Sequence, residues 1–213
     1  MNESVDEPLS AWLRSKQKEL DTWSFNSNPS IISYIVIHHS LTDDGATVNW
    51  NAIRTFHTSW RFGGNAISEQ KARELQSHGL KVESPWRDVG YHFGIEQVKD
   101  DYQIMLGREL NIRGAHVGDG GFNMKSIGIC LVGNFDKTPP PEKQFLLGQL
   151  LVKRLISYFG TKGMKIPVAN VIGHWEAQKI AGVPEIGRKS CPGRLFDIDK
   201  FRLGLNESER GIV

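Results

Sequence analysis

The chain has 213 residues, which is enough for one domain with a sizeable core. It is 39% hydrophobic and 23% charged with a net charge of +2, and it lacks the basic stripe, interleaved with aromatic residues, that binds nucleic acid. No apolar run reaches the roughly 18 residues of a membrane span, and the first residues are polar and acidic, unlike a signal peptide. We therefore expect a protein made in the cytoplasm, without membrane insertion. We also expect a monomer without nucleic-acid partners.

Residues 1–30 are expected to form an N-terminal helical appendage and a linker. Leucines recur near helical spacing in this segment, and Ser10 is a candidate N-cap. The polar stretch 24–30 contains Ser, Asn and Pro, which is typical of a linker. We divide the remaining chain into a main domain, residues 31–205, and a C-terminal tail, residues 206–213.

Apolar, β-branched runs alternate with runs of helical periodicity along the main domain. Strands are predicted at 31–37, 90–98, 102–106, 126–135 and 167–173. Helices are predicted at 48–60, 138–159 and 196–205. The stretch 62–88 is polar and interrupted by Gly and Pro, so we interpret it as a long excursion with one short helix. This alternation predicts an α/β fold, a single domain with a central mixed β-sheet flanked by helices.

Two adjacent histidines, His38 and His39, follow the first apolar strand. Alternate side chains of a strand share a face, so only one of the pair can face a metal while the strand stays regular. A later apolar run leads directly into His174, and Cys191 follows in a Gly- and Pro-containing segment. Two imidazoles and one thiolate suit Zn²⁺, and three protein ligands leave a fourth position open for water. For each residue alone, a structural role stays open.

Further polar side chains are candidates for a place around such a site. Lys189 shares a face with Cys191 if that segment is extended. Tyr91 begins a predicted strand and is either a site residue or a core aromatic. Glu176 either hydrogen-bonds a ligand histidine or places a favourable charge near a helix N-terminus. His116 lies in a glycine-rich loop and either contacts a substrate or braces the loop.

The remaining histidines and the second cysteine have weaker functional signals. His57 and His78 lie in polar, helical surroundings, and we expect both at the surface. Cys130 lies in the middle of a predicted buried strand, and we expect it to be a core residue.

Five motifs follow one another along the chain: YIVIHHS, DVGYHFGI, GAHVGDGGFNMKSIGICLVGNF, VIGHWE and KSCPG. In this order, from about residue 31 to residue 201, they resemble the zinc-dependent N-acetylmuramoyl-L-alanine amidases, the family of the amidase-type phage lysozymes and the peptidoglycan recognition proteins. The resemblance implies a zinc site at the strand ends, in a surface groove. The stretch 60–87 is longer than in the compact phage lysozymes.

The resemblance also implies a role for each site residue. Zn²⁺ would be held by His38, His174 and Cys191. Tyr91 matches the catalytic tyrosine of the family, and Lys189 matches a lysine of the phage lysozymes beside the thiolate. His116 matches a histidine that lines the substrate groove.

The implied activity is cleavage of the amide bond between N-acetylmuramic acid and L-alanine in bacterial peptidoglycan, as in endolysin-like lysis of the cell wall. Glu176 is expected in the second coordination shell. Two other functions stay open: a non-catalytic module that binds peptidoglycan or regulates another protein, and a cytoplasmic amidase that recycles muropeptides.

Overall fold

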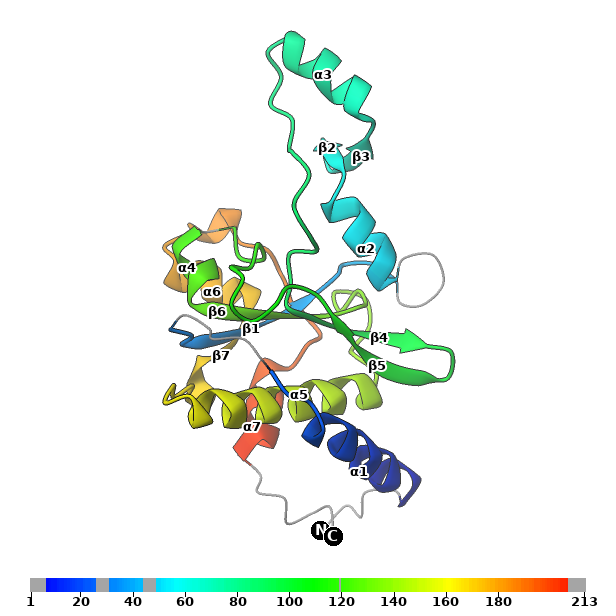
Figure 1. The fold of residues 1–213 in the computed structure, drawn as a ribbon, viewed down its shortest axis with the longest axis vertical. Helices are drawn as coiled ribbons and strands as arrows, with labels where there is room; N and C mark the ends of the chain where they lie inside the picture. Colours follow the sequence, from blue (N-terminus) through cyan, green and yellow to red (C-terminus); the bar gives the residue numbers. More distant parts are fainter. Residues whose placement is uncertain (1–6, 26–30, 44–48, 119, 207–213) are drawn as a thin grey trace.

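The structure, a computed structural model, describes residues 7–25, 31–43, 49–118 and 120–206. A five-stranded mixed sheet in the order β5-β4-β6-β1-β7 forms its centre (Figure 1). The strands of this sheet are β1 (Tyr34–His39), β4 (Phe93–Val98), β5 (Asp101–Leu106), β6 (Ser126–Leu131) and β7 (Val171–Gly173). All neighbours pair in parallel except β4 and β5, which form an antiparallel hairpin at one edge. The predicted fold class is confirmed.

Helices cover both faces of the sheet (Figure 1). The α-helices of the described residues are α1 (Glu7–Asp21), α2 (Trp50–His57), α3 (Glu69–Ser77), α4 (Gly120–Met124), α5 (Glu142–Thr161), α6 (His174–Ile180) and α7 (Ile198–Asn206), of which α3 lies away from the sheet. The largest apolar cluster lies between the sheet and α5, where Leu151 and Phe159 are fully buried beside Ile35 and Ile37. Burying each such side chain stabilises the fold by about 1.5–3 kcal/mol. Within the described residues, no helix has the length and apolar character to cross a membrane.

The N-terminal helix α1 is packed against α5. It begins at Glu7, so the predicted N-cap residue Ser10 lies inside the helix, where it is buried, and that prediction was wrong. Leu20 is 1% exposed and belongs to the main core. The side chain of Arg154 on α5 donates hydrogen bonds to the carbonyls of Leu20 and Trp23. The helix is therefore integrated into the main fold, while part of the predicted linker, residues 26–30, lies outside the described residues.

Strand β1 extends through both adjacent histidines. Its alternation is visible in the packing: Val36 contacts the cluster shared with α4 and α6, whereas Ile35 and Ile37 face the α5 side. His38 lies on the Val36 face and His39 on the opposite one, where its Nδ1 accepts a hydrogen bond from the Phe135 N–H at 3.1 Å. The pair is divided between the two faces, as the strand period predicts.

A long arm, residues 58–85, projects from the body beyond α2 (Figure 1). It contains the hairpin of β2 (Trp60–Phe62) and β3 (Asn65–Ile67), followed by α3. Helix α3 is the short helix that the sequence predicts in this excursion, whereas the hairpin is not predicted from the sequence.

Candidate active site

Three side chains from separate segments converge at the carboxyl ends of the parallel strands β1 and β7. His38 lies in β1, His174 is the first residue of α6, and Cys191 lies in the loop before α7. Their ligand atoms all lie within 4.8 Å of one another, and the three residues are buried. The Cys191 Sγ lies 3.6 Å from the His38 Nδ1. The structure thus brings together the three predicted metal ligands.

Strand pairing explains this convergence. Parallel strands β1 and β7 are neighbours, and Ile37 pairs with Gly173, so the residues that follow, His38 in β1 and His174 at the start of α6, lie at the carboxyl ends of the two strands. Backbone hydrogen bonds then secure the cysteine. The His39 N–H donates to the Cys191 Sγ at 3.4 Å, and the Trp175 N–H donates to the Cys191 carbonyl at 2.9 Å.

The two nitrogens of His174 have different surroundings. A hydrogen bond with the Val117 backbone orients the ring. The other nitrogen, Nε2, is buried without a hydrogen-bond partner among the described residues. Buried polar atoms are almost always satisfied, so this orphaned nitrogen, beside a thiol and a second imidazole, suits metal coordination.

The protonation states also fit a metal centre. Burial lowers the pKa of His174 to about 4 and holds the pKa of His38 well below its usual value, so both rings are neutral ligands at pH 7. Burial raises the pKa of the Cys191 thiol to about 12, against the lowering effect of the nearby Lys189 charge. A coordinated cation deprotonates such a thiol outright. The donor set fits a Zn²⁺ site with an open fourth position.

His116 contacts His38, the candidate ligand in β1. Its Nδ1 is 3.0 Å from the His38 Nε2, and its side chain is buried, with the residue only 6% exposed. The ring packs on β6 at Gly128, where an added Cβ would lie 2.7 Å from ring atoms, so this close approach needs glycine. The predicted substrate contact of His116 stays a prediction; the observed contact is with a candidate metal ligand.

Tyr91 and Lys189 flank the cluster. The Tyr91 ring centroid lies 5.1 Å from that of His38. Burial, followed by the effect of the thiols of Cys130 and Cys191, holds the Tyr91 pKa well above its usual value, so the hydroxyl is a proton donor at neutral pH. The exposed Lys189 lies close enough for its positive charge to lower the pKa of both ligand histidines.

The Glu176 carboxylate contacts the backbone of Gly173 and the side chain of Arg202. Its Oε2 accepts a hydrogen bond at 2.8 Å from the Gly173 N–H, and its carboxylate pairs with Arg202 at 3.1 Å. These contacts support the helix-terminus interpretation of Glu176 rather than the predicted second-shell contact with a ligand histidine. The reason is local: Gly173 is the N-cap of α6, and Glu176 is the third residue of that helix.

His57 is the residue near the site that the sequence does not single out. Its ring centroid lies 5.7 Å from that of Tyr91 and 4.7 Å from that of Trp86. The His57 Nδ1 accepts a hydrogen bond from the Gly90 N–H at 3.1 Å. His57 is therefore half-buried rather than at the surface as expected, because Trp86 and Gly90, which follow the arm in the chain, pack against it. His78 is exposed, as predicted.

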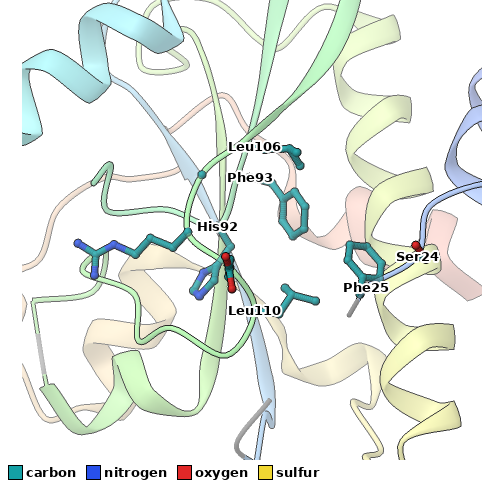
Figure 2. A pocket seen from close by; sticks show the side chains of 9 residues that line it. Ser24, Phe25, His92, Phe93, Leu106 and Leu110 are labelled. Carbon is teal, nitrogen blue, oxygen red and sulfur yellow. The ribbon is translucent and has the colours of Figure 1, made fainter. Parts of the chain in front are cut away.

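A groove borders the Tyr91 and His116 segments, and its lining includes Trp86, Arg108 and Arg113. A second pocket lies between the N-terminal segment and the β4–β5 hairpin. Figure 2 shows Phe25 and Phe93 side by side in its lining, where their rings pack edge to face. Its lining contains none of the three candidate metal ligands.

The mixed sheet and the buried His, His and Cys cluster at the carboxyl ends of its strands define an α/β protein with a candidate mononuclear metal site. A family model described as N-acetylmuramoyl-L-alanine amidase matches residues 27–194. The chain belongs to this family and is an N-acetylmuramoyl-L-alanine amidase by that membership. The predicted resemblance is thereby confirmed.

Individual relatives agree with the family. The endolysin of Enterobacteria phage K11 is 41% identical over 61% of this chain and 75% of the endolysin. Peptidoglycan-recognition protein LB of Drosophila melanogaster is 36% identical over 54% of this chain, and the match spans 43% of that relative's length. The structure of the endolysin amidase LysCS from Clostridium intestinale shares the fold, with a TM-score of 0.54 and 22% identity over 88% of this chain and 93% of that one.

Proposed function

We propose that this amidase is zinc-dependent and hydrolyses the amide bond between the lactyl group of N-acetylmuramic acid and the L-alanine of the peptidoglycan stem peptide. The observation that carries the proposal is the buried cluster of His38, His174 and Cys191, in which the Nε2 of His174 has no hydrogen-bond partner among the described residues. His38, His174 and Cys191 would hold the zinc ion, whose chemistry would be to activate water near neutral pH and to polarise the scissile carbonyl. Family membership supports the reaction type.

Two side chains of the chain would stabilise the developing oxyanion. Tyrosine is protonated at neutral pH, and burial raises the pKa of Tyr91 further, so its hydroxyl can donate a hydrogen bond to the carbonyl oxygen. Lys189 adds a positive charge near His38 and His174. One such donor contributes about 3 kcal/mol in the transition state. The carboxylate of Glu176 is engaged by Arg202 and by the N-terminus of α6.

His116 would orient the first ligand. With the His38 Nδ1 facing Cys191, the opposite nitrogen, Nε2, is left to bond with the His116 Nδ1 at 3.0 Å. Such a partner fixes the tautomer of a ligand histidine and its ring orientation. We therefore assign His116 the role of orienting the His38 ring, in addition to the groove contact that the family resemblance implies.

The biological setting that we propose is endolysin-like degradation of the bacterial cell wall by a monomer, with peptidoglycan rather than nucleic acid as the partner. Phage endolysins among the relatives support this setting over a non-catalytic binding module. The joint presence of Cys191, Tyr91 and Lys189 supports it as well.

The test is digestion of purified cell-wall sacculi, followed by mass spectrometry of the products. We expect free stem peptides and glycan without peptides, and we expect a chelator to abolish their release. Binding of sacculi without release would support the non-catalytic alternative. Cleavage of soluble anhydro-muropeptides without release from sacculi would support the recycling alternative.

A further inference from the structure

The base of the arm is built around a buried arginine, Arg61, which is 3% exposed. Its Nη1 donates hydrogen bonds to the carbonyls of Phe56, His57 and Ser59, at the C-terminal end of α2 and just beyond it. A cation at this end of a helix is favoured by the helix dipole. Arg61 thus ties the start of the arm to α2.

The returning segment of the arm meets the same residue. The Arg61 N–H donates to the Glu83 carbonyl at 3.0 Å, and the Glu83 N–H donates to the Arg61 carbonyl at 2.9 Å. Their side chains form an ion pair at 3.3 Å. Arg61 therefore connects the two segments through which the arm leaves and re-enters the body.

A continuous set of packed rings leads from Arg61 to the candidate active site. The guanidinium lies 4.7 Å from the centre of the Trp86 ring. Trp86 packs on His57 at 4.7 Å, and His57 lies 5.7 Å from Tyr91. Two hydrogen bonds hold His57 between Trp86 and Tyr91. Its Nδ1 accepts from the Gly90 N–H, and its carbonyl accepts from the Trp86 N–H.

We propose that Arg61 is a positioning residue of the amidase, which acts through Trp86 and His57 to hold the Tyr91 ring where its hydroxyl meets the substrate carbonyl. This inference rests on the proposed function, because it works through Tyr91. A displacement of a catalytic group by about 1 Å can cost on the order of 100-fold in rate. Loss of the guanidinium leaves the ring of Trp86 without its support, so the turnover number falls while the substrate keeps its own binding contacts.

A double-mutant cycle tests the proposal. Arg61→Ala, Tyr91→Phe and the double variant are compared by kcat and KM on one soluble muramoyl-peptide substrate, after circular dichroism has confirmed folding. We expect Arg61→Ala alone to lower kcat roughly tenfold, with KM within about twofold of wild type. In the Tyr91→Phe background we expect no further loss. Arg73→Ala is the matched control, since Arg73 is an exposed arginine of α3 paired with Glu69.

The outcomes separate this inference from the proposed function. An equal loss from Arg61→Ala in both backgrounds, or a change in KM alone, would overturn the positioning role. If Tyr91→Phe lowers kcat and Arg61→Ala does not, only the positioning role fails. If Tyr91→Phe leaves kcat unchanged, both the proposed role of Tyr91 and the positioning role of Arg61 fail.

A second variant covers the case in which Arg61→Ala does not fold. Trp86→Leu removes the ring between the guanidinium and His57 but leaves the half-buried position apolar. The same dependence on Tyr91 is expected, and wild-type kcat in Trp86→Leu would overturn the proposal.

Discussion

The His38 Nε2 and the His116 Nδ1 lie 3.0 Å apart, so one imidazole is held in place by another. Because His116 supports a candidate ligand, His116→Ala is expected to lower zinc affinity by about 10–100-fold. The measurement is a competition titration with a chromophoric chelator. His78→Ala, at an exposed histidine, is the control and should bind zinc as wild type does. Unchanged affinity in His116→Ala would remove the supporting role.

Tyr91→Phe should reduce turnover and leave metal binding intact. The variant keeps the ring that packs beside His38 and removes only the hydroxyl. Loss of one oxyanion donor costs about 100–1,000-fold in kcat. Steady-state kinetics and zinc content measured on the same preparation check this expectation. Wild-type turnover would exclude the hydroxyl from the reaction.

Acid should destabilise the fold through His92. Its Nδ1 accepts a hydrogen bond from the Gly128 N–H at 3.0 Å, which requires a neutral ring, and burial lowers its pKa to about 4. The unfolded chain protonates near pH 6.5, so the stability due to this residue is present above that pH and is lost as pH falls from 6.5 to 4. The loss is about 3 kcal/mol.

Urea unfolding of the metal-free protein at pH 7.5, 5.5 and 4.5 measures this loss. His92→Gln should show a shallower fall in the free energy of unfolding than wild type, because the substituted side chain does not titrate. Parallel pH profiles for the two proteins would contradict the assignment.

Leu20→Ala tests whether α1 belongs to the fold. Leu20 is 1% exposed in the main core, so its truncation is expected to cost about 2–5 kcal/mol. Lys18→Ala, on the exposed side of the same helix, should change stability by less than about 0.5 kcal/mol. Chemical denaturation measures both. Equal, small effects would mean that α1 is an independent appendage, as the sequence-based division proposes.

Long periodic segments were predictable because their patterns are local. The β-branched run that becomes β1 and the leucine spacing of α5 each identify an element, and the parallel strand ends then bring His38 and His174 together. Segments α4 and α6, with five and seven residues, are too short to show a period. The three-residue strands of the arm hairpin have the same limitation.

Contacts across the arm were not predictable for a different reason. His57 bonds to Gly90 across 33 residues, and nothing near His57 in the chain indicates that Trp86 returns to cover it. Glu176 shows the opposite case. Its position three residues after Gly173 indicates a capping contact from sequence spacing alone, and the structure contains that contact.

The central claim is that one histidine of the adjacent pair, His38, holds zinc together with His174 and Cys191. The most direct measurement is the zinc content of His38→Ala and His39→Ala, determined by elemental analysis after dialysis, with folding confirmed for both. We expect His38→Ala to lose its zinc, and His39→Ala to keep close to one equivalent because His39 contacts the thiol through backbone atoms, which the substitution retains. Loss of zinc from His39→Ala with retention in His38→Ala would contradict the account.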